Sequence, residues 1–159
     1  MSTHKAVPGV RGRLALAIRV EQLAARIYAI LAERFADSPE ACAMFRRLEA
    51  EEHEHELRIE MLAGLLARRP ELERSLVLDL ARMELALADG EAIATVLSSP
   101  RPRPPLYRVR RLVAQLEERF ASAHADQLTA QSNPELQEFF RVFVAQDRQH
   151  AALLRGETP

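Results

Sequence analysis

A charged pair interrupts an apolar stripe between residues 45 and 66. The apolar members of this stripe are Phe45, Leu48, Ile59, Leu62 and Leu66. Their spacing of three and four residues places them on one face of a helix, the face that packs against a core. Glu52 and His55 fill the two gaps in the series. A carboxylate and an imidazole on a buried stripe are unfavourable without a partner, so the fold must supply something that pairs with both.

The same periodicity predicts four long helices, over about residues 13–36, 39–67, 106–130 and 134–154. Ser38 before Pro39, and Asn133 before Pro134, are typical of a helix cap followed by proline at the first helical position. Residues 71–97 hold a further helical pattern, which we expect to be interrupted near Asp89-Gly90. Residues 98–105 contain four of the nine prolines and predict a stiff, extended connector.

Composition narrows the class of protein. Apolar residues make up 48% and charged residues 28%, with 5 Gly and no Trp, which favours an all-helical soluble protein. A net charge of −1 argues against nucleic-acid or anionic-membrane partners. The single cysteine, Cys42, excludes an internal disulfide and cysteine-rich metal sites. The sequence contains no apolar run typical of a signal peptide or long enough to span a membrane, so we expect a cytoplasmic protein. We also expect a flexible tail over residues 1–11 and a single domain over residues 12–156.

The chain contains an internal repeat. Residues 13–67 correspond to residues 106–154, and residues 68–105 form the crossover between them. The offset of about 95 residues between the two Pro-Glu helix starts also carries Glu52-x-x-His55 onto Asp147-x-x-His150. Glu21, on the apolar stripe of the first helix, corresponds to Glu117 in the third. Both halves therefore predict ionisable side chains at equivalent core positions.

These ionisable residues stand where a plain helical bundle has Leu or Ile. They are Glu21, Glu52, His55, Glu117, Asp147 and His150. Four carboxylates packed together would repel in a low-dielectric interior, whereas a pair of divalent or trivalent cations would remove the repulsion. Glu and His three residues apart on one helix can reach the same ion. Mixed oxygen and imidazole ligands suit iron or manganese, and zinc or copper less well. A hydrogen-bonded polar core without metal is the alternative.

This arrangement resembles the ferritin-like di-metal carboxylate proteins, in which two helices give a Glu each and two give Glu-x-x-His. Within them it is most similar to the rubrerythrin family, on the strength of Glu21 with Tyr28 seven residues later, Glu51-Glu52-His53-Glu54-His55, and Glu117 with Asp147-x-x-His150. The resemblance implies a ferritin-like four-helix bundle whose long crossover, between the second and third helices, contains an additional helix. It also implies two iron ions, with manganese or zinc as alternatives, and a hydrogen-bonding role for Tyr28 beside them. The metal ligands that it implies are Glu21, Glu52, His55, Glu117, Asp147 and His150.

The chain departs from the rubrerythrin pattern at several points. Asp147 stands where the family has Glu, and Phe120 stands where rubrerythrins carry an additional carboxylate. His124 occupies the position that matches Tyr28, and we expect a partly buried side chain too far from Glu117 to share an ion with it. Glu51, His53 and Glu54 are expected on the solvated face. No cysteine pairs follow the helices, so redox turnover would need an external electron donor such as a rubredoxin-like protein.

The leading hypothesis is therefore a di-iron oxidoreductase of rubrerythrin type that reduces peroxide or reacts with dioxygen. Two alternatives stay open: a ferroxidase or iron-binding module without peroxidase turnover, and a structural helical bundle without metal. The resemblance further implies a homodimer.

Overall fold

The computed structural model describes residues 10–157, and all regular secondary structure in that range is helical. The helices are α1 (Val10–Arg34), α2 (Pro39–Leu66), α3 (Pro70–Ser75), α4 (Leu80–Leu97), α5 (Leu106–Ala130) and α6 (Pro134–Arg155). This confirms the predicted all-α bundle. The four long helices of the internal repeat begin and end within about three residues of their predicted bounds.

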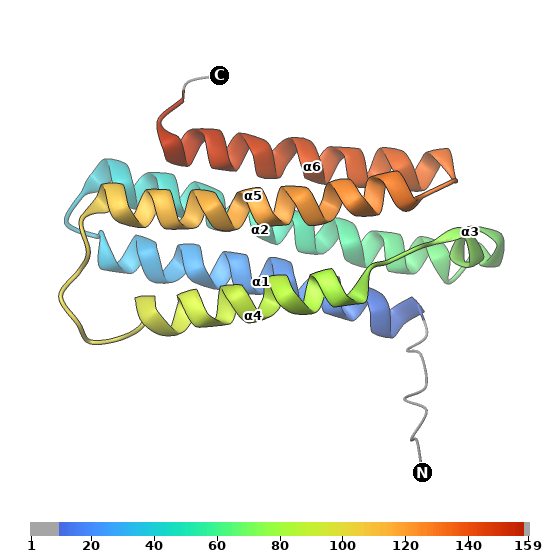
Figure 1. Ribbon diagram of the computed structural model, residues 1–159, viewed down its shortest axis with the longest axis horizontal. Coiled ribbons are helices and arrows are strands. Elements are labelled where there is room, and N and C mark those ends of the chain that lie inside the picture. The colour runs from blue at the N-terminus through green and yellow to red at the C-terminus, as the bar shows by residue number, and fades with distance from the viewer. Residues whose placement is uncertain (1–9, 158–159) are drawn as a thin grey trace, which may run out of the picture.

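The long helices form two antiparallel hairpins, α1 with α2 and α5 with α6, that lie side by side (Figure 1). Helices α2 and α5 run in the same direction, so the chain must return along the whole bundle between them. Helix α4 makes this return and packs along α1, with a smaller contact on α5. The crossover therefore contains α3 and α4, and it covers one side of the first hairpin.

Helix starts in both hairpins follow the predicted cap residues. Ser38 is the extended residue before α2 and Pro39 is the first helical residue. Asn133 Oδ1 accepts hydrogen bonds from the backbone N–H groups of Glu135 and Leu136, at 2.8 and 3.3 Å, and so satisfies two donors at the start of α6. The cap and proline signals therefore located these two turns correctly.

The predicted interruption near Asp89-Gly90 is wrong, because α4 runs through both residues. A Cβ atom built on Gly90 would lie 2.6 Å from Leu23 Cδ2. Glycine at this position therefore lets α4 approach α1 closely, and it does not break the helix.

The break in this region lies earlier, over residues 76–79. Two side chains at the end of α5 bind its backbone: Gln131 Oε1, from the residue that follows the helix, accepts from Val77 N at 3.1 Å, and Gln127 Oε1 accepts from Asp79 N at 2.9 Å. Asp79 in turn caps α4 by accepting from Arg82 N. These long-range contacts satisfy donors that the helices leave free.

The predicted tail over residues 1–11 overlaps α1, which begins at Val10. Residues 1–9 lie outside the described part of the chain. The Pro-rich connector is non-helical, as predicted. Arg34, at the end of α1, holds it by donating to the carbonyl oxygens of Leu97, Ser99 and Arg101. None of the helices described is long and apolar enough to span a membrane.

Two apolar clusters divide the core along the bundle. On α2, the first includes Phe45 and Leu48, and the second includes Ile59 and Leu62. Glu52 and His55 lie between these pairs, and they expose only 2% and 0% of their surface. The predicted stripe is therefore a core face, and its charged pair lies inside the bundle.

Candidate metal centre

Seven ionisable side chains are buried together between the two apolar clusters. None exposes more than 8% of its surface, and the set comprises the six predicted ligands and one histidine that was not among them. The residues are Glu21, Glu52, His55, Glu117, His124, Asp147 and His150. Each of the four long helices contributes at least one of them, because each places a polar residue on its core-facing stripe.

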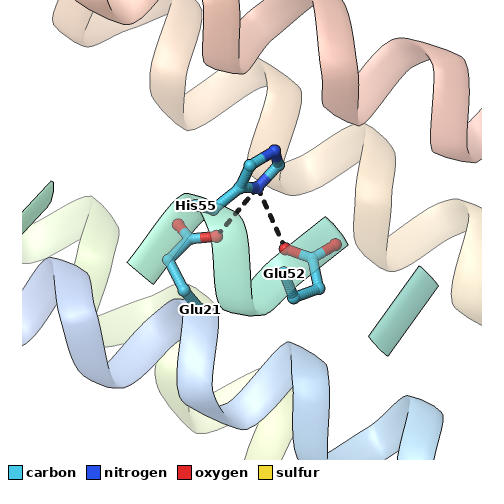
Figure 2. Close-up of side chains that lie close together, drawn as sticks. All are labelled: Glu21, Glu52 and His55. Carbon is cyan, nitrogen blue, oxygen red and sulfur yellow. Dashed lines mark hydrogen bonds and ion pairs between the residues drawn. The ribbon is translucent and has the colours of Figure 1, made fainter. Parts of the chain in front are cut away.

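A first group consists of Glu21, Glu52 and His55. Figure 2 shows both carboxylates pointing at one ring nitrogen of His55, Glu21 from α1 and Glu52 from the same helix as the histidine. His55 Nδ1 lies 3.3 Å from Glu21 Oε2 and 3.1 Å from Glu52 Oε2. Three ligand atoms of this group lie within 4.8 Å of one another, an arrangement that can hold a metal ion.

A second group consists of Glu52, Glu117 and His150. His150 Nδ1 lies 2.9 Å from Glu52 Oε1 and 3.7 Å from Glu117 Oε2. One ligand atom from each of the three residues also lies within 4.8 Å of the other two. Glu52 thus belongs to both groups and turns one oxygen toward each histidine. This is the arrangement expected of a carboxylate that bridges two ions.

Asp147, the sixth predicted ligand, is buried but belongs to neither group. Its Oδ2 lies 2.6 Å from His124 Nδ1. His124 is itself 8% exposed, and its Nε2 lies 3.7 Å from Glu21 Oε1. We expected His124 to be only partly buried. Its side chain is instead buried and lies in the centre beside Glu21. The structure brings five of the six predicted ligands into two groups and holds the sixth next to them.

Each histidine of the two groups has an outer partner on its second ring nitrogen. His55 Nε2 lies 3.0 Å from Gln146 Oε1, and His150 Nε2 lies 2.7 Å from Glu51 Oε2. Such partners fix the ring orientation and the tautomer, leaving Nδ1 directed at the centre. Arg58 also donates to Gln146 Oε1, at 2.7 Å.

The expected exposure of Glu51 was wrong, because this side chain is half-buried against His150, whereas His53 and Glu54 are exposed as predicted. Glu51 and Gln146 are separated by the repeat offset and immediately precede Glu52 and Asp147. Extending the repeat by one position is the signal that could have found them.

Tyr28 lies beside the buried carboxylates of the centre. It is buried on α1, and its hydroxyl donates a hydrogen bond to Glu117 Oε1. Burial, together with the nearby charges of Glu117 and Glu52, raises the pKa of Tyr28 well above its usual value. The phenol therefore keeps its proton and serves as a donor to this carboxylate.

The carboxyl groups of the centre differ in their affinity for protons. Burial raises the pKa of Glu21 to about 7, and burial with the charge of Glu52 raises the pKa of Glu117 to about 7. Burial also opposes ionisation of Glu52, but its contacts with His150 and His55 outweigh burial and lower its pKa to about 2. Glu52 is therefore the carboxylate that stays charged.

All three histidines of the centre favour the charged form. Burial lowers their pKa values, but neighbouring carboxylates outweigh it. The pKa is about 10 for His55 beside Glu21 and Glu52, and about 11 for His150 beside Glu117 and Glu52. For His124, the charge of Asp147 raises the pKa to about 9. Protons thus supply the positive charge that four buried carboxylates require.

The donor set fits a pair of divalent ions. Glu52 Oε1 and His150 Nδ1 lie 2.9 Å apart and pair with each other when the ring carries a proton on that nitrogen. Two other buried oxygens of the centre, Glu21 Oε1 and Glu117 Oε2, have no hydrogen-bond partner within the described chain. An unpaired buried polar group costs about 1–3 kcal/mol, so these atoms call for a ligand. Two ligand atoms that bind one ion at about 2.1 Å, at a right angle, lie about 3 Å apart. The separations within the two groups, 2.9–3.7 Å, are close to this value.

The chain matches no protein-family model, no curated protein and no solved structure. The residues of the centre form a buried cluster of carboxylates and imidazoles, arranged as two groups that share Glu52 and that could each hold a metal ion.

Proposed function

We propose that this protein is a di-metal carboxylate oxidoreductase, with two iron ions, of the rubrerythrin type within the ferritin-like proteins. The observation that carries the proposal is the pair of ligand groups sharing Glu52, with two unpaired buried carboxylate oxygens among them. The order of the long helices and the parallel α2 and α5 support the ferritin-like assignment. Carboxylate oxygen with imidazole nitrogen is a donor set that suits iron.

In this proposal Glu21, Glu52 and His55 hold one ion, and Glu52, Glu117 and His150 hold the other. The ions would supply redox equivalents and open coordination positions for peroxide or dioxygen. The chain itself excludes bulk water, since every ligand is buried. Gln146 and Glu51 orient the two histidines so that Nδ1 faces the centre.

Proton supply is the second task of these residues. Reduction of peroxide to water consumes protons. Tyr28 donates to Glu117 Oε1 and so places an O–H group beside that proposed ligand. Electrons would come from an external donor such as a rubredoxin-like protein.

Uptake of Fe(II) under anaerobic conditions, followed by peroxide, tests the proposal. We expect about two equivalents of Fe(II) per chain, and oxidation of two Fe(II) for each peroxide consumed. Uptake of less than about half an equivalent of Fe(II) by pure protein would rule out a di-iron function. Loss of uptake in Glu52→Ala and His150→Ala would assign the metal to this centre.

The position of Asp147 favours a second candidate, an iron-binding or ferroxidase module without peroxidase turnover. Because Asp147 lies outside both groups, one bridging carboxylate fewer would control the ions. The same experiment separates the two functions. A store takes up Fe(II) but oxidises it slowly and without fixed stoichiometry to peroxide, whereas a ferroxidase reacts with dioxygen in preference to peroxide.

A further inference from the structure

His124 is the one buried histidine of the centre that the two ligand groups leave out. It lies on α5, and its Nδ1 is 2.6 Å from Asp147 Oδ2. When the ring is neutral, the proton belongs on Nδ1, where the carboxylate accepts it. The other nitrogen, Nε2, then presents a lone pair, and a lone pair on a buried imidazole is a metal-ligand atom.

The free nitrogen of His124 is directed at Glu21. Nε2 lies 3.7 Å from Glu21 Oε1, which is too far for a hydrogen bond, and Oε1 is buried without a hydrogen-bond partner in the described chain. The second oxygen of Glu21 faces His55 Nδ1 at 3.3 Å. Glu21 therefore stands between two imidazoles. A separation of 3.7 Å suits two ligand atoms of one ion better than two atoms in direct contact.

We propose that His124 is a nitrogen ligand of the ion held by Glu21, Glu52 and His55, and that Asp147 orients His124 and does not bridge the two ions. The inference rests on the proposed function, because it requires this ion to bind. Asp147, His124 and the ion form the carboxylate–histidine–metal sequence that is common at protein metal sites. Asp147 keeps a role in the centre, but as a positioning residue.

The symmetry of the repeat supports this assignment. Tyr28 and His124 are equivalent positions of α1 and α5, and each faces the glutamate of the opposite hairpin. Tyr28 donates its hydroxyl to Glu117. His124 donates Nδ1–H to Asp147, and an ion at Nε2 would replace the proton that the charged ring carries there. One ion thus receives two imidazoles and the other receives one, so the two sites differ in chemistry.

Proton NMR of the Co(II)-loaded protein counts the histidine ligands directly. Each bound imidazole retains one N–H, and the unpaired electrons of Co(II) shift that exchangeable proton far from the ordinary spectrum. Gln146, Glu51 and Asp147 accept these protons from His55, His150 and His124, and buried hydrogen bonds slow their exchange with water. We expect three shifted exchangeable resonances in the wild-type protein.

His124→Gln should remove one of the three resonances and leave two. Tyr28→Phe, at the equivalent position of the other hairpin, and His53→Gln, at an exposed histidine, should each retain three. The count in the wild-type protein needs no variant, so a folding defect in His124→Gln does not obscure the result. Two resonances in the wild-type protein, both kept in His124→Gln, would overturn the proposal.

Asp147→Asn separates an orienting carboxylate from a bridging one. We expect Co(II) affinity to fall by about 10–100-fold at the ion bound by two imidazoles and to change little at the other. An equal loss at both ions contradicts the orienting role. If the wild-type protein takes up two Co(II) but shows two resonances, only this inference fails. If it takes up neither Co(II) nor Fe(II), the proposed function fails with it.

Discussion

In the first half of the bundle Glu51 and Glu52 precede His55, and in the second half Gln146 and Asp147 precede His150. The backbone positions are equivalent, but the side chains reach different partners. Glu52 extends to both histidines, at 3.1 and 2.9 Å, whereas Asp147, one methylene shorter, meets His124. The repeat therefore determines the backbone position of each acidic residue. The length of the side chain determines which atoms its carboxylate contacts.

The two halves also differ at the equivalent positions Tyr28 and His124. They differ further in their packing against helix α4. Helix α4 packs along α1 in the first hairpin, with Gly90 against Leu23, and its contact with α5 of the second hairpin is smaller. The same four-helix frame therefore carries two unequal carboxylate–histidine groups and one additional covering helix.

The strongest test of this inequality is the substitution of its shared carboxylate. Glu52→Gln removes a ligand from both groups, so we expect Co(II) affinity to fall by more than about 100-fold at both ions. The matched variant Asp147→Asn should retain at least one tightly bound ion. Equilibrium dialysis with metal analysis gives the stoichiometry. Equal losses in the two variants would mean that both carboxylates bridge.

The pH dependence of folding stability in the metal-free protein tests a feature that both halves share, a buried glutamate with a raised pKa. Because the pKa of Glu21 and of Glu117 rises from 4.5 to about 7, the folded state keeps protons that the unfolded state releases, and stability falls between these pH values. The histidines add stability that is complete below pH 6.5 and is lost as pH rises through about 9–11. Glu52, with its pKa lowered to about 2, adds stability above pH 4.5 that is lost toward pH 2.

We therefore expect the metal-free protein to be most stable near pH 4.5 and to lose stability continuously toward pH 10, as measured by urea unfolding. Glu21→Gln and Glu117→Gln should each remove part of the loss between pH 4.5 and 7. If either variant alone showed no change in unfolding free energy between pH 4.5 and 7, the substituted glutamate would account for the whole loss in the wild-type protein. Bound metal should reverse the trend, because ions displace the protons.

Exchanging the outer histidine partners sharpens the comparison. Glu51→Gln gives His150 the amide partner that His55 has, and we expect Co(II) affinity at the His150 ion to fall by about 10-fold. Gln146→Glu is the converse change and should tighten the His55 ion. Competition with a coloured chelator measures both affinities. Unchanged affinities in both variants would mean that the outer partners do not cause the difference between the ions.

The smallest effect concerns the covering helix. Gly90→Ala places a Cβ 2.6 Å from Leu23 Cδ2, and we expect a loss of about 1 kcal/mol in unfolding free energy, since overpacking exceeds the gain in helix propensity. Gly64→Ala on α2, where a Cβ meets nothing within 4 Å, is the control and should gain up to about 1 kcal/mol. Equal gains in both variants would indicate that Leu23 moves aside freely.

Much of the fold and centre follows from local patterns. The caps at Ser38 and Asn133 and the stripe positions of Glu52 and His55 depend on neighbouring residues, so the sequence predicts them. The break at residues 76–79 does not, because Gln127 and Gln131 contact it from the end of a helix that is distant in sequence. The contacts of Glu51 and His124 likewise depend on which side chains meet across the hairpins, and helical periodicity within one helix contains no such information.

Glu52 also affects how the chain is held together. An ion bound by Glu52, Glu117 and His150 would close a loop of about 65 residues across the hairpins, in the way that a disulfide restricts an unfolded chain. The chain has a single cysteine and forms no such internal bond. Metal ions would then act as its removable cross-links, and a chelator would loosen the association of the two hairpins as well as stop any redox chemistry.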